Sequence, residues 1–199
     1  MHSAPGNGIA LSLHSTGKHP AVFLDRDGTL MEDADYCHAP SQVAVYPGAA
    51  WALRRLREAG FRLVIVTNQS GIGRGYFTET NFQRVQTEFF RQLGSHELID
   101  AVYHCPDTPF VESPRRKPAP GMILEAARDL DLDLARSFIV GDKADDLACG
   151  RHAGLAGGIL VLTGKGREQA GKCQPDFTAE TLGDAADWIL QRTVPLPHG

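Results

Sequence analysis

The chain has 199 residues and a formal net charge of −4, with 42% hydrophobic and 22% charged residues. These are ordinary values for a globular protein, and the length suits one domain with a single sizeable core. The acidic balance disfavours nucleic acids and anionic membrane surfaces as partners. No apolar run approaches the roughly 18 residues of a membrane-spanning helix, so we expect no membrane association.

The spacing of the cysteines indicates the cellular compartment, and the composition of the two ends of the chain indicates the bounds of the domain. Four widely spaced cysteines are present, which are Cys37, Cys105, Cys149 and Cys173. Their spacing favours reduced thiols over a disulfide framework, so we expect a cytoplasmic protein. Residues 1–20 are rich in Gly, Ser, His and Pro, and their short apolar run lacks a basic flank, which favours a loose tail over a signal peptide. One domain is then expected over residues 21–193, followed by a short tail at residues 194–199.

The first predicted element is a buried strand at residues 21–24, where four apolar residues follow one another. It runs directly into residues 25–29, which read Asp-Arg-Asp-Gly-Thr. Two carboxylates at the end of an apolar strand are unsuited to a core, but they suit a site that binds a divalent cation and attacks an electrophile. In an open α/β sheet such sites lie at the carboxyl ends of strands. Alone, this pentapeptide also fits a turn or part of a calcium loop.

Strand and helix patterns alternate along the rest of the chain. Further strands are predicted at residues 61–66, 99–103, 138–140 and 158–162. Amphipathic helices are predicted at residues 49–59, from Thr78 or Thr80 to about residue 93, within residues 118–130, and at residues 145–153 and 182–191. This alternation predicts an α/β fold, a Rossmann-like doubly wound parallel sheet with helices on both faces.

Polar residues follow several of these strands. Residues 67–70 (Thr-Asn-Gln-Ser) follow the second strand, Asp142 follows a later one, and residues 115–117 (Arg-Arg-Lys) lie in a loop before a helix. Each segment also has an ordinary explanation. Residues 67–70 could form a turn, Asp142 could lie at the positive end of a helix, and residues 115–117 could be a solvated basic run. Because the carboxyl ends of parallel strands meet at one edge of a sheet, we expect these groups to converge on Asp25 and Asp27.

Together these side chains have the chemistry to hydrolyse a phosphomonoester. A carboxylate that attacks a phosphate meets charge repulsion, which a divalent cation bound by Asp25, Asp142 and an oxygen of Asp27 would neutralise. The Thr67 hydroxyl and nearby backbone N–H groups can hold phosphate oxygens, while Lys117 supplies a fixed positive charge. Asp27 can protonate the leaving alkoxide and then deprotonate the water that cleaves an aspartyl-phosphate.

The ordered motifs resemble those of the haloacid dehalogenase (HAD) superfamily of phosphohydrolases. The similar segments are residues 23–29, 66–68, 117–118 and 141–146. The resemblance implies a HAD-like fold with Asp25 as the nucleophile and Asp27 as the acid–base. It implies Mg²⁺ held by Asp25, Asp142 and the main-chain carbonyl of Asp27, with Asp146 as a supporting ligand. The competing class is a non-catalytic domain that binds a phosphate or sugar phosphate.

A longer set of segments resembles the D-glycero-D-manno-heptose-1,7-bisphosphate phosphatases and the related histidinol-phosphatases. These segments are residues 25–29, 33–36, 67–75, 116–122 and 141–143. On this resemblance we assign substrate contacts to residues around the catalytic set, namely Arg26, Asp33, Tyr36, Asn68, Gln69, Ser70, Arg116 and Lys143. The implied substrate is a small phosphorylated sugar, a heptose bisphosphate of bacterial surface-polysaccharide (lipopolysaccharide) synthesis, with histidinol phosphate as the alternative. The forked guanidinium of Arg116 suits a second phosphate.

One loop departs from that subgroup. Its members commonly hold zinc before the Arg-Lys-Pro motif with a Cys-x-His pair and a Cys-x-Cys pair. Residues 104–117 retain Cys105 alone, and Asp107 stands in the position of the histidine. Because one thiolate cannot supply the four ligands of a structural zinc site, we expect no zinc.

The motif spacing also predicts an enzyme without a large cap domain. About 40 residues separate Asp27 from Thr67, and about 50 separate Thr67 from Lys117, most of them used by core elements. That leaves no room for a further domain of typical size. An open site keeps a nucleic-acid 3′-phosphatase as a remote alternative, against which the acidic charge counts. We expect a monomer or a weak homo-oligomer.

Overall fold

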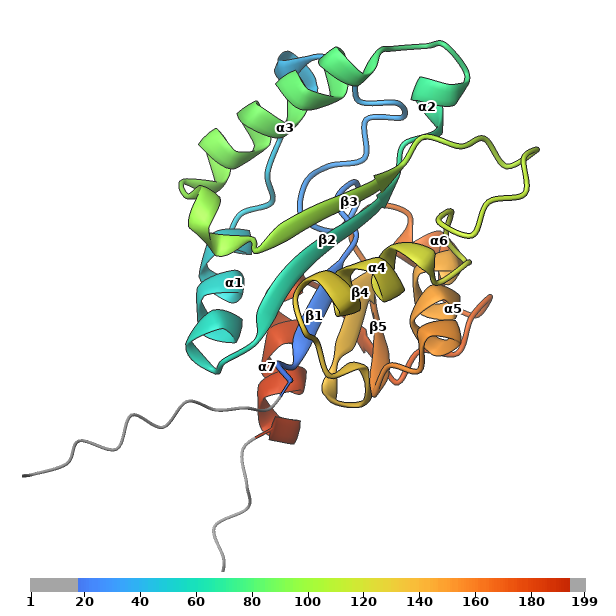
Figure 1. The fold of residues 1–199 in the computed structure, drawn as a ribbon. Helices are drawn as coiled ribbons and strands as arrows, with labels where there is room; N and C mark the ends of the chain where they lie inside the picture. Colours follow the sequence, from blue (N-terminus) through green and yellow to red (C-terminus); the bar gives the residue numbers. More distant parts are fainter. Residues whose placement is uncertain (1–17, 194–199) are drawn as a thin grey trace, which may run out of the picture.

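β1 (Ala21–Leu24) lies inside a parallel sheet in the computed structural model, which describes residues 18–193 (Figure 1). The other strands are β2 (Arg62–Asn68), β3 (Ala101–Cys105), β4 (Phe138–Gly141), β5 (Gly157–Val161) and β6 (Phe177–Ala179). Their order is β3-β2-β1-β4-β5-β6, and every neighbouring pair is parallel. The order reverses direction beside β1, which is where open α/β sheets form their sites.

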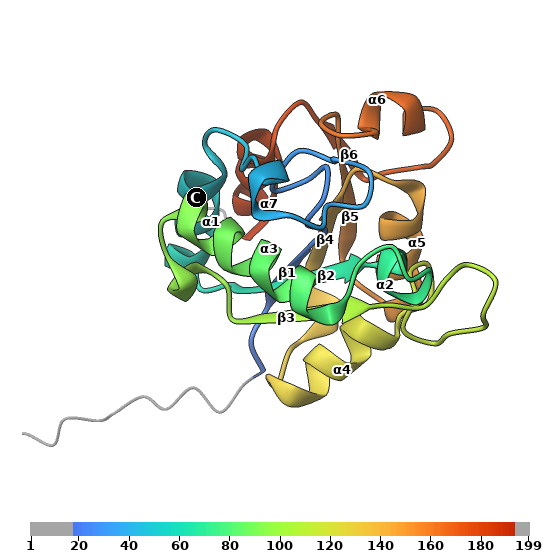
Figure 2. The same cartoon turned by 90° about the horizontal axis from the view of Figure 1, so that it is seen from above.

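Helices cover both faces of this sheet. They are α1 (Ala49–Glu58), α2 (Ser70–Gly73), α3 (Glu79–Leu93), α4 (Gly121–Asp129), α5 (Ala144–Ala153), α6 (Gly166–Gln169) and α7 (Leu182–Thr193). α1, α3 and α7 cover one face, and α4 and α5 cover the other (Figure 2). Val22 and Leu24 pack with residues of the first three helices, whereas Ala21 and Phe23 pack with residues of the other two. Successive strand residues point to opposite faces, so a strand buried on both faces is apolar throughout.

The doubly wound α/β prediction is confirmed, and several element bounds agree closely. Thr78 caps α3, because its hydroxyl oxygen accepts a hydrogen bond from the Asn81 N–H at 3.3 Å. The predicted strand at residues 99–103 begins two residues later, since a 3₁₀ helix (His96–Leu98) occupies the approach to it. β6, α2 and α6 were not predicted, because each has only three or four residues, too few to establish a periodic pattern.

Two long connections lie at the carboxyl edge of the sheet. Residues 25–48 join β1 to α1, and residues 106–120 join β3 to α4. Neither forms a separate unit, and the described part of the chain contains no large cap domain. Within the same residues, no helix is both long enough and apolar enough to cross a bilayer. The predicted tails fall outside the described residues, apart from residues 18–20.

Candidate active site

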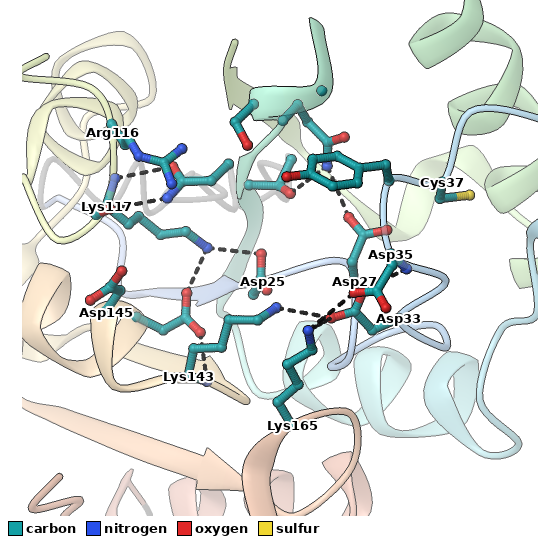
Figure 3. A pocket seen from close by; sticks show the side chains of 17 residues that line it. Asp25, Asp27, Asp33, Asp35, Cys37, Arg116, Lys117, Lys143, Asp145 and Lys165 are labelled. Atoms are coloured by element: carbon teal, nitrogen blue, oxygen red, sulfur yellow. Dashed lines mark hydrogen bonds and ion pairs between the residues drawn. The ribbon is translucent and has the colours of Figure 1, made fainter. Parts of the chain in front are cut away.

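A pocket of about 370 Å³ opens at the carboxyl ends of β1, β2 and β4 (Figure 3). Most of the side chains that the sequence assigned to the site line it: Asp25, Asp27, Asp33, Tyr36, Thr67, Asn68, Gln69, Ser70, Arg116, Lys117, Lys143 and Asp146. Asp142 is fully buried next to them. The structure therefore brings together groups that are up to 121 positions apart in sequence, from Asp25 to Asp146.

Asp25 and Lys117 form a buried ion pair in the pocket. Lys117 Nζ lies 2.8 Å from Asp25 Oδ1 and 2.6 Å from Asp146 Oδ1, and it donates a hydrogen bond to the Val66 carbonyl at 2.8 Å. Burial alone would raise the pKa of Asp25, but the charges of Lys117 and Lys143 outweigh this, so the pKa is lowered. Burial would lower the pKa of Lys117, yet the carboxylates raise it. Both groups are therefore charged at neutral pH.

Three buried carboxylates are grouped closely enough to share one cation. Oxygens of Asp25, Asp142 and Asp146 all lie within 4.8 Å of one another. Asp142 Oδ2 accepts a hydrogen bond from the Lys165 N–H at 2.9 Å. The buried Oδ1 has no hydrogen-bond partner in the described residues and lies 3.4 Å from Lys143 Nζ. Burial, followed by the charge of Asp25, raises the pKa of Asp142 to about 7. A buried carboxylate oxygen that forms no hydrogen bond and lies among other carboxylates fits a hard divalent cation such as Mg²⁺.

Both oxygens of Asp146 are held by protein donors at 3.0 Å or less, whereas Oδ1 of Asp142 has its nearest cation at 3.4 Å. Asp146 Oδ1 lies against Lys117, and Asp146 Oδ2 accepts a hydrogen bond from the Lys143 N–H at 3.0 Å. This arrangement fits a supporting role better than a full place in a coordination shell.

Gly28 allows the chain to pass close to Asp142. Its φ is +90°, a conformation that favours glycine, and a Cβ at this position would overlap the Asp142 carboxylate. The glycine that follows the two aspartates is therefore needed both for the turn and for space.

Asp27 is held by hydrogen bonds from two directions. Arg26 Nε donates to Asp27 Oδ2 at 3.1 Å, and Gln69 Nε2 donates to Oδ2 at 2.9 Å and to Thr67 Oγ1 at 2.9 Å. Arg26 differs from the prediction that it contacts substrate. Its side chain is fully buried outside the pocket lining, with the guanidinium 5.1 Å from the Phe82 ring. It therefore positions Asp27 instead.

Asn68 joins β2 to the loop before α4. Its side-chain amide donates to the Lys117 carbonyl at 3.0 Å, and its carbonyl oxygen accepts from the Lys117 N–H at 3.1 Å. These two bonds fix the backbone from which Lys117 reaches Asp25. Asn68 lines the pocket, but its polar atoms are already engaged within the protein.

The outer wall of the pocket includes a lysine that the sequence analysis missed. Lys165 Nζ lies 3.1 Å from Asp35 Oδ1, and Lys143 Nζ lies 3.3 Å from Asp33 Oδ2 (Figure 3). Lys165 follows β5 in a Thr-Gly-Lys-Gly segment. Its position after a predicted strand could have assigned it to the pocket, as it did for Asp25 and Asp142. Tyr36, on the same wall, is 43% exposed.

Comparison with known proteins places the chain in a family. A sequence model of the HAD-hydrolase-like family matches residues 114–185. The D-glycero-beta-D-manno-heptose-1,7-bisphosphate 7-phosphatase of Pasteurella multocida is 39% identical over 171 residues, which cover 82% of this chain and 93% of the relative. The enzyme of the same name from Escherichia coli K12 is 40% identical over 187 residues, which cover 90% of this chain and 92% of the relative.

Solved structures agree with these relatives. The crystal structure of D,D-heptose 1,7-bisphosphate phosphatase from B. bronchiseptica, complexed with magnesium and phosphate, matches with a TM-score of 0.79 and 33% identity. The match covers 87% of this chain and 99% of that one. The resemblance inferred from the ordered motifs is confirmed: the chain is a phosphatase of the HAD superfamily and belongs to the family of the heptose-1,7-bisphosphate 7-phosphatases.

Proposed function

We propose that this phosphatase removes the 7-phosphate from D-glycero-D-manno-heptose 1,7-bisphosphate in bacterial surface-polysaccharide synthesis, with Mg²⁺ as its cofactor. The main support is the buried Asp25–Lys117 pair beside an oxygen of Asp142 that forms no hydrogen bond, in a chain about 40% identical to enzymes named for this reaction. The relatives support the choice of substrate, and the pocket supports the chemistry.

The proposed reaction proceeds in two displacements at phosphorus. Asp25 attacks the phosphate, a bond forms between its carboxylate oxygen and phosphorus, and the bond to the sugar oxygen breaks. Asp27 gives its proton to the departing alkoxide. Water then attacks the aspartyl-phosphate after Asp27 takes its proton, which releases phosphate and regenerates the Asp25 carboxylate. Thr67 and Lys117 hold the charge that gathers on the phosphate oxygens.

Mg²⁺ would be held by Asp25, Asp142 and the main-chain carbonyl of Asp27, with Asp146 in support. When bound, it neutralises the repulsion between the anionic nucleophile and the anionic substrate. The related enzyme complexed with magnesium and phosphate supports this choice of metal.

The second phosphate of the substrate needs cations away from the buried pair. Among the lining residues, Arg116, Lys143 and Lys165 are partly exposed cations, and Lys143 already pairs with the buried Asp142. Arg116 can bind a phosphate through two parallel N–H donors, which supports a bisphosphate over a monoester.

Phosphate release from the heptose bisphosphate tests the proposal, with ³¹P NMR of the product to identify the ester that remains. We expect Mg²⁺-dependent loss of the 7-phosphate, retention of the 1-phosphate, and no turnover in EDTA. A higher kcat/KM for histidinol phosphate than for the heptose bisphosphate would make histidinol phosphate the preferred substrate and refute the proposal. Binding of the bisphosphate without any turnover would instead indicate a non-catalytic sugar-phosphate-binding domain.

A further inference from the structure

The loop between β3 and α4 places Arg116 at the pocket, although little backbone hydrogen bonding holds its outer part. It projects from the carboxyl edge of the sheet before it returns to α4 (Figure 1). Residues 107–113 form one backbone–backbone hydrogen bond among themselves, from the Val111 N–H to the Thr108 carbonyl at 3.2 Å. Phe110 near the tip is 84% exposed. Side chains must therefore fix the path of the loop.

Ser113 joins the two arms of this loop. Its Oγ accepts hydrogen bonds from the N–H groups of Arg115 and Arg116, both at 3.3 Å. Hydrogen bonds from Ser113 and Cys105 lower the pKa of Asp107, which keeps that carboxyl ionised as an acceptor. The Cys105 thiol donates to Asp107 Oδ2 at 3.4 Å and lies 3.7 Å from Ser113 Oγ. We refer to Cys105, Asp107 and Ser113 as the loop clamp.

Arg116 is attached to the loop clamp at both of its ends. Ser113 accepts its backbone N–H, and the Asp107 carbonyl accepts its Nη1 at 3.0 Å. No other hydrogen bond of this guanidinium is formed within residues 18–193, so its remaining donors are available to a ligand. The pocket side of Arg116 is thus free while its orientation is fixed from behind.

A metal ion does not fit the loop clamp. Zinc in a structural site takes four ligands, and its cysteine ligands are thiolates. Burial raises the pKa of the Cys105 thiol, and that thiol already donates a hydrogen bond to Asp107. In the described residues, three potential metal ligands lie close to one another at Asp25, Asp142 and Asp146. None of the three belongs to this loop.

We propose that Ser113 is a positioning residue for the reaction: through the hydrogen-bonded, metal-free loop clamp, it holds Arg116 in the orientation that binds the second anionic group of the substrate. This inference rests on the proposed function, because it takes Arg116 as the group that recognises that anion. It extends the proposed function by explaining how the loop keeps Arg116 in place without zinc.

The kinetic test is a double-mutant cycle with Ser113→Ala and Arg116→Ala on the heptose bisphosphate. We expect Ser113→Ala to raise KM by about three- to tenfold with kcat nearly unchanged, as expected for weakened binding. In the Arg116→Ala background the same change should have almost no effect, since Ser113 acts through Arg116. Ser113→Thr, which keeps the hydroxyl, should restore KM. An equal effect of Ser113→Ala in both backgrounds would overturn the positioning role.

Ser95→Ala is the matched control. The Ser95 hydroxyl also accepts a backbone hydrogen bond, from the Glu97 N–H at 3.1 Å, but it lies before β3, at the opposite end of that strand from the pocket. Its loss should leave KM unchanged. An equal rise of KM in this variant would assign the Ser113 effect to general destabilisation.

Hydrogen exchange without substrate separates this inference from the proposed function. Ser113→Ala should speed exchange at the Arg115 and Arg116 amides by about threefold or more, because both lose their acceptor. Unchanged exchange at both amides would overturn the loop clamp, whatever the substrate. Suppose that exchange is faster in Ser113→Ala but the native enzyme does not turn over the bisphosphate. The loop clamp would then be established, whereas the proposed substrate and the role of the clamp in binding it would both be refuted.

Discussion

The base of the pocket and its rim are built in opposite ways. The base consists of Asp25, Lys117, Asp142 and Asp146, each of them no more than 4% exposed. The rim consists of Asp33, Asp35, Tyr36, Arg116 and Lys165, all of them partly or fully exposed. Asp25 and Asp142 directly follow strands, and Asp146 lies in the first turn of α5. Lys117 is the exception, because it lies in the loop before α4, where Asn68 of β2 fixes its backbone. The rim is carried by loops and by the approach to the short helix α6.

This difference separates reaction from recognition. In the base, charges are desolvated and fixed, so each interaction is stronger than it would be in water and needs no rearrangement during the reaction. At the rim, the ion pairs are screened by solvent and are weak enough for a ligand to replace them. We therefore expect changes in the base to lower kcat for every substrate, and changes in the rim to alter KM for particular substrates.

The largest effect should come from the nucleophile. We expect Asp25→Asn to lower kcat at least about 1,000-fold on any phosphomonoester, because the amide can neither attack phosphorus nor bind the cation as a carboxylate does. Thermal unfolding should show that the variant still folds. Activity within tenfold of the native enzyme would refute the aspartyl-phosphate mechanism and the proposed role of the base.

The next effect concerns the metal and pH. The pKa of Asp142 is about 7 before a cation binds, so below that pH a bound proton must leave before Mg²⁺ enters. Apparent Mg²⁺ affinity should fall by about tenfold per pH unit below 7 and level off above it. Mg²⁺ titrations of activity between pH 5.5 and 8.5 measure this. An affinity that does not change over that range would show that Asp142 is not a ligand.

A smaller effect is expected at the rim lysine. Lys165→Met should raise KM for the heptose bisphosphate about two- to fivefold and leave kcat unchanged, because a partly exposed charge contributes little. Lys172→Met, which removes an exposed lysine away from this pocket, is the matched control. A fall in kcat with unchanged KM would show that Lys165 acts on the base, where its N–H contacts Asp142.

No effect is expected from removing zinc. The purified protein should hold less than about 0.1 zinc per chain, because one thiol cannot complete a structural site. A zinc chelator in excess Mg²⁺ should leave kcat/KM unchanged. One zinc retained per chain through purification would contradict this and would require ligands beyond Cys105.

Asp25 and Asp142 of the base were predictable from sequence because they follow apolar strands, whereas Lys117 and Asp146 were assigned from the ordered motifs. Asp25 and Asp142 are placed by short strands whose buried pattern is visible locally, and parallel pairing then brings them to one edge. Whether each residue acts as assigned remains a prediction. Arg26 shows the limit of reasoning from motifs: the resemblance assigned it a substrate contact, but its side chain turns toward Phe82 and Gln86 of α3.

The rim was less predictable, because loop paths depend on contacts between residues distant in sequence. Lys165 reaches the pocket because β5 pairs with β4, which brings the end of β5 close to Asp142. Ser113 matters through hydrogen bonds to neighbouring amides and to Asp107, and no periodic pattern reports such contacts. Short elements such as β6 escaped detection for a similar reason, since they are defined by their neighbours.

The division between base and rim is tested most directly by kcat/KM of the native enzyme and of Arg116→Ala, each measured on heptose 1,7-bisphosphate and on histidinol phosphate. We expect Arg116→Ala to lower kcat/KM about 10- to 100-fold on the bisphosphate and less than about twofold on the monoester, because only the bisphosphate offers the guanidinium a second phosphate. Equal losses on both substrates would contradict it, since Arg116 would then act on the reaction itself and not on recognition.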